Sequence, residues 1–281
     1  MVDSINNLRG GTIKCAASRC CTCMVKTVHS IKSIEKCYPT GEEPLLVLCS
    51  DMNEYICKYP RTNGAAYKMA SELVGVLLAQ TWKLKTPVPA FVKISPSHWT
   101  RAGKGGVLAL GSKRMTSVID INPITEGGIP SLPKIAKELL RIALFDFWVA
   151  NEDRNANNAN LMFDVSQNTL VSIDYGCIFN TAMYDYPMSQ LTSTDTILAS
   201  GVFEQLKTGM KKQSLPIISR YYTQCIHRSQ QAVTNILNVI PTQWNIPQSI
   251  ITGKLNQLFD TKWMNDTWDN FKVCFMENLA K

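Results

Sequence analysis

Short runs of apolar residues near the start of the chain have the length of β-strands. Residues 45–49 form one run and residues 54–59 form a second, and a polar segment with Asp51 and Asn53 lies between them. Two such runs joined by Asp, Asn and Ser residues are typical of a β-hairpin. Residues 91–94 and 107–110 are equally short and apolar, so we predict four strands in this part of the chain.

Between these pairs of strands the apolar residues recur every three or four positions, as on one face of a helix. The predicted helix follows Asn63-Gly64, which breaks the chain, and it ends before Pro87 and Pro89. Its apolar stripe consists of Met69, Leu73, Val76 and Leu77. We therefore expect one amphipathic helix to pack against the strands.

A second apolar helix is predicted after a linker at 120–133, which contains three prolines and Gly127-Gly128. Ser131 is a suitable N-cap for this helix, and Pro133 is tolerated in its first turn. The helix leads directly into a stretch rich in asparagine, residues 151–160. Its apolar face consists of Ile135, Leu139, Ile142 and Val149.

The rest of the chain is predicted to form one hairpin followed by helices. The hairpin has strands at 161–163 and 169–173, and the helices lie at 202–210, 216–239, 249–259 and 263–279. The chain thus divides into an N-terminal extension (1–37), a β-rich part (38–120) and a mostly helical part (121–281). Strands followed by helices indicate an α+β fold.

Length and composition allow a full hydrophobic core. The chain has 281 residues, of which 45% are hydrophobic, enough for one large domain or two lobes. The net charge of +7 is mild and the Lys and Arg residues are scattered, so we expect no nucleic-acid partner. No run reaches the roughly 18 apolar residues of a membrane span, and the N-terminus lacks an apolar signal core. We therefore predict a cytoplasmic protein without a membrane span.

Ten cysteines are present, and six of them precede residue 50. Four of these lack the paired C-x2-C spacing of a structural zinc site, and we interpret them as reduced thiols of a poorly ordered extension: Cys15, Cys20, Cys21 and Cys23. The last four cysteines lie in apolar segments and are expected to be small core residues: Cys57, Cys177, Cys225 and Cys274.

The asparagine-rich stretch carries side chains suited to phosphoryl transfer. Asp153 lies just beyond the apolar helix, Asn158 follows five residues later, and Asp174 ends the returning hairpin. Because a hairpin brings its two ends together, we expect Asn158 and Asp174 to face one cavity. Their oxygens suit Mg²⁺, which would free Asp153 to accept or orient a hydroxyl proton. Asn and Asp are also common turn formers, but their joint spacing favours the catalytic interpretation.

A cation for nucleotide phosphates is expected at Lys58, which lies in the second strand between apolar neighbours. An inward-facing lysine needs a partner, and Glu72 in the following helix is placed to supply one. An exposed lysine and a solvated glutamate fit the spacing equally well. The loop at 38–44 lies where a phosphate cover is expected, but it has one glycine, Gly41, and two acids that would repel phosphate. Residues 103–106 are richer in glycine but follow Lys58.

Three segments of the chain resemble the HipA-like kinases, and the compact, stand-alone members more than the longer toxin. These segments are S-E-L-V-G-V-L-L-A-Q-T-W-K-L-K-T-P-V-P-A, F-D-F-W-V-A-N-E-D-R-N-A-N-N-A-N-L-M-F and S-I-D-Y-G-C-I-F. The resemblance covers residues 38–185 well and the helical tail loosely. It implies a two-lobed, protein-kinase-like fold, with a small β-rich N-lobe, a mostly helical C-lobe and ATP between the lobes.

The resemblance also implies roles in the predicted C-lobe. Asp153 would be the catalytic base. Asn158 and Asp174 would hold Mg²⁺. Asn151 and Arg154 would be supporting residues of the catalytic loop.

In the predicted N-lobe, the resemblance implies that Lys58 contacts the nucleotide phosphates and that Glu72 is its ion-pair partner. Some members of the family phosphorylate themselves in the phosphate-binding loop. Thr40, next to Gly41, is the residue of this chain nearest to that role. The tight Gly/Ser phosphate loop of the toxin is not evident in this sequence.

The implied function is ATP- and Mg²⁺-dependent transfer of the γ-phosphate to Ser or Thr of a protein substrate, with an antitoxin-like or regulatory protein as a further partner. Two alternatives stay open. D-R-N-A-N-N-A-N is similar to the D-R-x-x-N loop of phosphoinositide kinases, although the chain has no basic amphipathic helix for a membrane surface. The helical tail would suit a partner-binding platform with nucleotide binding only, although its large apolar residues fit an ordinary core better: Trp244, Trp263, Met264 and Trp268.

Overall fold

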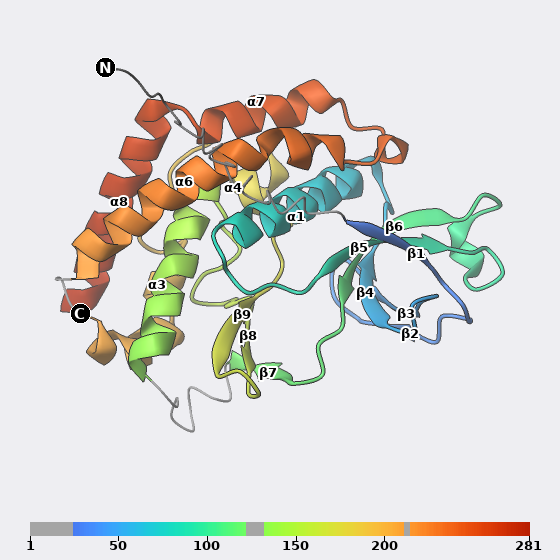
Figure 1. Ribbon diagram of the computed structural model, residues 1–281, viewed down its shortest axis with the longest axis horizontal. Coiled ribbons are helices and arrows are strands. Elements are labelled where there is room, and N and C mark those ends of the chain that lie inside the picture. The colour runs from blue at the N-terminus through green and yellow to red at the C-terminus, as the bar shows by residue number, and fades with distance from the viewer. Residues whose placement is uncertain (1–24, 122–131, 211–213) are drawn as a thin grey trace, which may run out of the picture.

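A six-stranded sheet forms the N-terminal part of the molecule (Figure 1). The computed structural model describes residues 25–121, 132–210 and 214–281. The sheet has the order β1-β5-β6-β4-β3-β2, and every neighbouring pair is antiparallel except β1 and β5. Its strands are β1 (Lys26–His29), β2 (Lys36–Cys37), β3 (Leu45–Leu48), β4 (Glu54–Lys58), β5 (Pro89–Ile94) and β6 (Val107–Lys113).

The predicted hairpin is confirmed as β3 and β4, in which Val47 pairs with Tyr55 and both side chains are fully buried. The structure differs from the sequence expectation in residues 25–37. We expected this stretch to stand apart, but it contributes the two outer strands, β1 and β2. The cluster of four cysteines between Cys15 and Cys23 lies outside the described residues.

A second sheet and most of the helices form the rest of the molecule. The small sheet has the order β7-β8-β9, with strands β7 (Val118–Asp120), β8 (Leu161–Asp164) and β9 (Thr169–Ser172). The longer helices are α1 (Asn63–Thr81), α3 (Leu132–Val149), α5 (Gly201–Leu206), α6 (Leu215–Asn238), α7 (Gln248–Leu258) and α8 (Thr261–Ala280). Short 3-10 helices lie at Thr100–Ala102, Ile197–Ala199, Lys207–Gly209 and Thr242–Trp244. The α+β fold is therefore confirmed, with a β-rich N-terminal part and a mostly helical C-terminal part.

The turn called α4 (Ile178–Ala182) is unusual because residues 179–182 have φ between 52° and 61°. This left-handed backbone is rare for residues with a Cβ. Side-chain contacts hold the turn in place. Asn180 donates to Glu152 at 2.6 Å and accepts from the Ser189 backbone at 2.8 Å, and Thr181 donates to Glu152 at 2.9 Å.

Helix α1 belongs to both parts of the molecule. It follows β4 and lies between the sheet and α6 (Figure 1). At its C-terminal end the indole of Trp82 stacks on Trp148 of α3, with ring centroids 5.3 Å apart, and donates to Ser229 of α6 at 3.1 Å. A single hydrophobic core thus runs from α1 through α3 to the C-terminal helices.

The aromatic residues of the helical tail belong to this core. Trp244 and Trp263 are buried, and the ring of Trp268 stacks on Tyr222 and Phe271. Trp244 and Trp263 are thus core residues, and Met264 and Trp268 are partly buried against the same core, which favours the ordinary-core interpretation over a partner-binding platform. The predicted cap of α3 at Ser131 lies outside the described residues. In the part of the chain that the structure describes, none of the helices has the length and apolar character needed to span a membrane.

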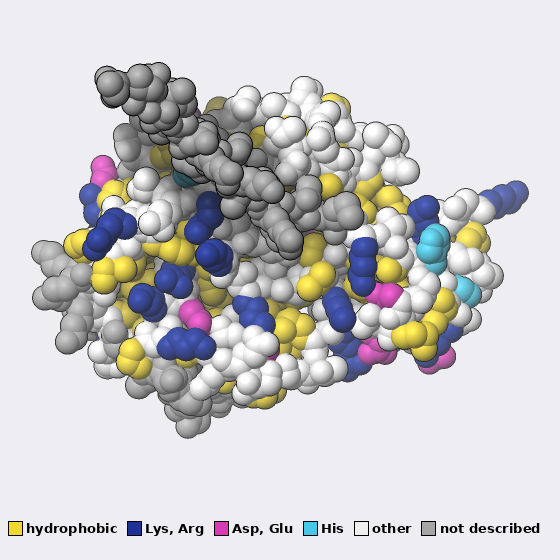
Figure 2. Space-filling view, in the orientation of Figure 1, with side chains coloured by type: hydrophobic (Ala, Val, Ile, Leu, Met, Phe, Trp, Pro, Cys, Tyr) yellow, Lys and Arg dark blue, Asp and Glu magenta, His cyan; other side chains and the backbone are white. Residues whose placement is uncertain are grey.

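Charged side chains are distributed without a single-sign stripe on the face shown in Figure 2. Lys and Arg lie over the helical part and the sheet, with Asp, Glu and apolar residues between them. This arrangement agrees with the scattered basic residues of the sequence.

Replacing Gly75 of α1 with alanine is expected to lower the free energy of unfolding by about 1–3 kcal/mol, because the added methyl group overpacks the core. A Cβ at Gly75 would lie 2.4 Å from the Cβ of Tyr175, which is fully buried. Urea unfolding measures the change. Gly253→Ala in α7 is the matched control, because no atom lies within 4 Å of its Cβ position, and it should stabilise the protein by about 1 kcal/mol. Equal losses in both variants would contradict the packing argument.

Candidate active site

The asparagine-rich loop after α3 is anchored in the core at its start. The backbone N–H of Asn151 donates to the carbonyl of Asp146 at 2.9 Å, and its side-chain amide donates to the Asp146 carboxylate at 3.0 Å. Both residues are fully buried. Asp146, which interrupts the apolar segment of α3 in the sequence, is therefore the residue that ties the loop to the helix.

Arg154 makes the largest set of contacts in the loop although its side chain is fully buried. Its Nε donates to Asp146 at 2.8 Å, and its Nη2 donates to the carbonyl of Ile173 at 3.1 Å. Nη1 donates to the carbonyls of Ala159, at 3.3 Å, and Asn160. The guanidinium thus joins α3, the end of the loop and the strand that returns to Asp174.

Burial of Asp146 raises the pKa of its carboxyl group to about 6, although Arg154 and Asn151 both act to lower it. A charge in the interior is expensive unless it is paired and hydrogen-bonded. The loop therefore depends on a complete Asp146–Arg154 pair.

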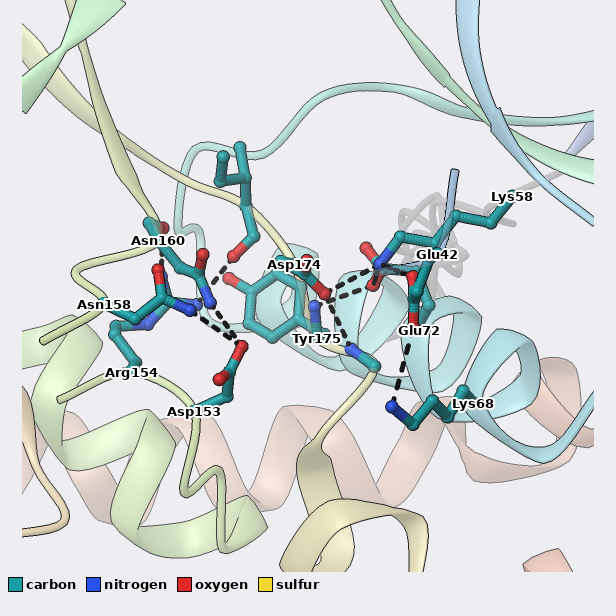
Figure 3. A network of polar contacts seen from close by, with 12 residues as sticks. Glu42, Lys58, Lys68, Glu72, Asp153, Arg154, Asn158, Asn160, Asp174 and Tyr175 are labelled. Carbon is teal, nitrogen blue, oxygen red and sulfur yellow. Dashed lines mark hydrogen bonds and ion pairs between the residues drawn. The ribbon is translucent and has the colours of Figure 1, made fainter. Parts of the chain in front are cut away.

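Asp153 is partly exposed, and its carboxylate points toward Asn158 and Asn160 (Figure 3). Its Oδ2 accepts two hydrogen bonds, from the amide of Asn158 at 3.0 Å and from the amide of Asn160 at 2.8 Å. Two donors on one oxygen fix the direction of the carboxylate and leave its other oxygen without a hydrogen bond from the described residues. The sequence analysis did not single out Asn160. It lies two residues beyond Asn158 and donates to the same carboxylate oxygen.

Asp174 follows the β8–β9 hairpin and has a φ of 57°, in the left-handed region. The preceding backbone joins it to the loop, because the N–H of Ile173 donates to the carbonyl of Asn160 at 3.1 Å. Its Oδ1 accepts from Lys58 at 2.7 Å and from the backbone of Gly176 at 3.3 Å. The Asp174 side chain is 38% exposed to solvent. The loop and the end of the hairpin therefore meet at Asn160 and Ile173, and a cavity shared by Asn158 and Asp174 stays a prediction.

Lys58 and Glu72 form an ion pair, with 3.1 Å between Nζ and Oε2. Glu72 is buried in α1 and also accepts from the backbone of Tyr175 at 2.8 Å. Lys58 makes two further ion pairs, with Asp174 at 2.7 Å and with Glu42 at 2.9 Å (Figure 3). Of the two interpretations that the spacing left open, the paired lysine is the one observed.

The pKa values of this cluster depend on burial and mutual attraction. Burial acts to lower the pKa of Lys58, but the carboxylates of Glu72, Asp174 and Glu42 raise it well above its ordinary value. Burial acts to raise the pKa of Asp174, but Lys58 holds it below its ordinary value. Burial raises the pKa of Glu72, against the effect of Lys58. Lys58 is therefore a permanent cation at the centre of three carboxylates.

The loop at 38–44 contacts Lys58 through Glu42, and its role as a phosphate cover stays a prediction. Thr40 and Gly41 are exposed, and the carbonyl of Gly41 accepts from Arg61 at 3.4 Å. A cavity of about 700 Å³ opens beside the loop and is lined by Gly41, Glu42, Lys58, part of α1 and residues 181–186. Glu42 does not stand apart as an isolated repelling charge, because it is paired with Lys58.

The donor set of Asp174 and Asn158 is suited to Mg²⁺. Both supply hard oxygen atoms, and few protein ligands are needed because Mg²⁺ keeps waters and phosphate oxygens. The ammonium of Lys58, 2.7 Å from Asp174, shows that this carboxylate already attracts a cation. In the part of the chain that the structure describes, no group of three or more His, Cys, Asp and Glu residues offers an alternative metal site.

Two comparisons with known proteins found similarities to kinases. A family model described as "HipA-like kinase" matches residues 31–272. Among solved structures, the chain is similar to the crystal structure of a Helicobacter pylori proinflammatory kinase, CtkA, with 15% sequence identity and a TM-score of 0.47. That similarity covers 89% of this chain and 99% of the other. No curated protein sequence matches the chain.

Proposed function

This chain belongs to the HipA-like kinase family, and we propose that it transfers the γ-phosphate of ATP to a Ser or Thr hydroxyl of a protein, with Mg²⁺ as the metal. A kinase domain implies a phosphotransferase that uses ATP; the metal and the acceptor are the proposed parts. One observation supports the proposal above all others. Lys58 contacts both Glu72 and Asp174 beside the loop that holds Asp153. Asp174 lies 116 residues beyond Lys58 in the chain.

The predicted site residues of the loop and the hairpin have three proposed roles. Asp153 accepts the proton of the acceptor hydroxyl, because its carboxylate is oriented by two amides and partly exposed. Asn158 and Asp174 would hold Mg²⁺, which would supply positive charge against the charge that develops on the phosphate oxygens. Asn151 and Arg154 are positioning residues, since both are buried and reach the substrate only through the loop.

The cations and the covering loop handle the nucleotide. Lys58 binds the phosphates, and Glu72 positions Lys58. Thr40 and Gly41 belong to the loop that covers the phosphates, and Thr40 is exposed, as a site of autophosphorylation must be. During transfer the acceptor oxygen forms a bond to the γ-phosphorus and its proton passes to Asp153. The bond between that phosphorus and the bridging oxygen breaks, which releases ADP.

Incubation with ATP labelled on its terminal phosphate tests the proposed function. We expect label to reach the chain itself or a protein of an added lysate when Mg²⁺ is present, and to vanish when Mg²⁺ is chelated. Label on phosphoinositide vesicles and not on protein would show a lipid kinase. Binding of ATP without transfer to any acceptor class would contradict the proposed reaction and leave a nucleotide-binding module.

Replacing Asn158 with alanine in this assay is expected to lower the rate of transfer at least tenfold and to raise the Mg²⁺ concentration needed for half-maximal rate. The reason is the loss of one proposed metal ligand and of one hydrogen bond to Asp153. Asn157→Ala is the matched control, because Asn157 is exposed in the same loop and lies next to Asn158 in sequence. Equal losses in the two variants would show that the loop is merely disturbed.

A further inference from the structure

Glu42 is held between two lysines that come from different elements. One carboxylate oxygen lies 2.9 Å from Nζ of Lys58 in β4, and the other lies 3.8 Å from Nζ of Lys68 in α1 (Figure 3). The Glu42 side chain is 34% exposed to solvent and lines the cavity of about 700 Å³. A negative group therefore lines the cavity and bridges two cations.

Lys68 reaches this position because of the helical repeat. It precedes Glu72 by four residues, so the two side chains lie one turn apart on the same face of α1. Glu72 pairs with Lys58 at 3.1 Å, and Lys68, which lines the cavity, lies 3.8 Å from Glu42, the other partner of Lys58. The helix that positions Lys58 thus brings a second cation to the same place.

The covering loop is fastened mainly at its other acid. Glu43 pairs with Arg61 at 3.1 Å and with Arg101 at 3.6 Å, and the loop closes on itself through a hydrogen bond from Tyr38 to Pro44 at 2.9 Å. Glu42 is consequently the loop's ion-pair contact with the lysine cluster. Its ion-pair partners, Lys58 and Lys68, are different from those of Glu43.

We propose that Glu42 takes the position of the nucleotide's terminal phosphates until ATP binds, and that Lys68 is a second phosphate-binding residue that receives them when Glu42 leaves. This inference rests on the proposed function, because it needs the phosphates to meet Lys58. A polyphosphate carries more negative charge than one carboxylate and offers more oxygens to two lysines. It can therefore displace Glu42, but it does so against a competing ion pair.

The competition has a measurable consequence for affinity. A ligand that binds only molecules in which Glu42 has left the lysines has an apparent dissociation constant equal to its intrinsic value divided by the fraction of such molecules. If Glu42 occupies the lysines in about 90% of molecules, Glu42→Gln should lower the Kd for ATP about tenfold. The gain should be much smaller for AMP, whose single phosphate does not extend to the terminal position.

Calorimetry with ATP, ADP and AMP on the full-length chain tests this inference. We expect Glu42→Gln to bind ATP about tenfold more tightly than wild type. We expect Lys68→Gln to bind ATP several-fold more weakly in the Glu42→Gln background, with AMP binding unchanged and ATP binding restored by Lys68→Arg. Glu43→Gln is the matched control, since Glu43 neighbours Glu42 but pairs with Arg61 and Arg101, and it should leave the ratio of ATP to AMP affinity unchanged.

Several outcomes would overturn the inference. If Glu42→Gln and Glu43→Gln change ATP affinity equally, the loop's overall charge matters and not the position of Glu42. If Lys68→Gln weakens ATP and AMP alike, or neither, Lys68 does not bind the terminal phosphates. If wild type binds ATP and transfers phosphate in either of these cases, the proposed function stands without the inference. If no variant binds any nucleotide, the proposed function and the inference fail together.

Discussion

Replacing Asp153 with asparagine is expected to lower the turnover number by about 10²–10⁴-fold, the usual contribution of general base catalysis. Asparagine keeps the size of the side chain but cannot accept the acceptor proton. ATP affinity should change by less than about twofold, because the proposed phosphate contacts belong to Lys58 and not to Asp153. Single-turnover rates with labelled ATP, and calorimetry on the same samples, separate the two quantities.

Glu152→Gln is the control for this prediction. Glu152 is adjacent in sequence, but its carboxylate accepts from Asn180 and Thr181 of the left-handed turn and not from the loop amides. Its replacement should cost less than about tenfold in turnover. Loss of activity to the same extent in both variants would show that the acidic loop acts as a unit, and would remove Asp153 from the role of base.

Replacing Arg154 with methionine is expected to lower the free energy of unfolding by about 3–5 kcal/mol at neutral pH, because Asp146 is left as an unpaired charge in the core. The carbonyls of Ala159, Asn160 and Ile173 also lose their donor. Urea unfolding measures the loss. The double variant Arg154→Met with Asp146→Leu should recover part of it, because neither partner is then charged. A double variant less stable than the single one would contradict this explanation.

The cost of Arg154→Met should also depend on pH. The pKa of Asp146 in the folded protein, about 6, lies above its ordinary value of 3.8, so the folded state binds the proton more tightly than the unfolded state. The corresponding stability is present at low pH and is lost as the pH rises through about 6. Without Arg154 the folded pKa rises further, so the variant should lose most stability above pH 6 and least near pH 4. A loss that is the same across this range would count against a buried, unpaired carboxylate.

The elements that depend on local periodicity could be predicted from the sequence. The β3–β4 hairpin, α1 and α3 lie where apolar spacing placed them, although residues 69–79 of α1 and 142–149 of α3 are buried on every side and not on one face alone. Strand β1 could not be found in this way. Three of its four residues are exposed, and it is held by parallel pairing with β5, more than 60 residues away. Such pairing leaves little mark on the strand's own sequence.

The candidate site shows the same division between local and distant contacts. Asp153 and Asn158 lie five residues apart, and their contact follows from one loop. The position of Glu42 could not be predicted, because the sign of its effect depends on what lies opposite. As an isolated acid it would repel phosphate, but two lysines from other elements face it. The pairing of Asp146 with Arg154 could not be predicted either, because Arg154 becomes its neighbour only when the chain leaves the helix.

The position of α1 limits how this enzyme can be switched. Helix α1 carries Glu72, the ion-pair partner of Lys58, so an outward rotation of the helix would separate this pair from the proposed phosphate site. At the C-terminal end of α1, Trp82 stacks on Trp148 and donates a hydrogen bond to Ser229. Ser71 on the same helix forms a hydrogen bond with Tyr184 at 2.8 Å. Outward rotation of α1 would expose the hydrophobic core that it shares with the C-terminal helices. The free energy required would therefore be that of partial unfolding. Amide hydrogens of α1 should therefore exchange as slowly as those of α3, and any on–off control must act through a part that moves without the core.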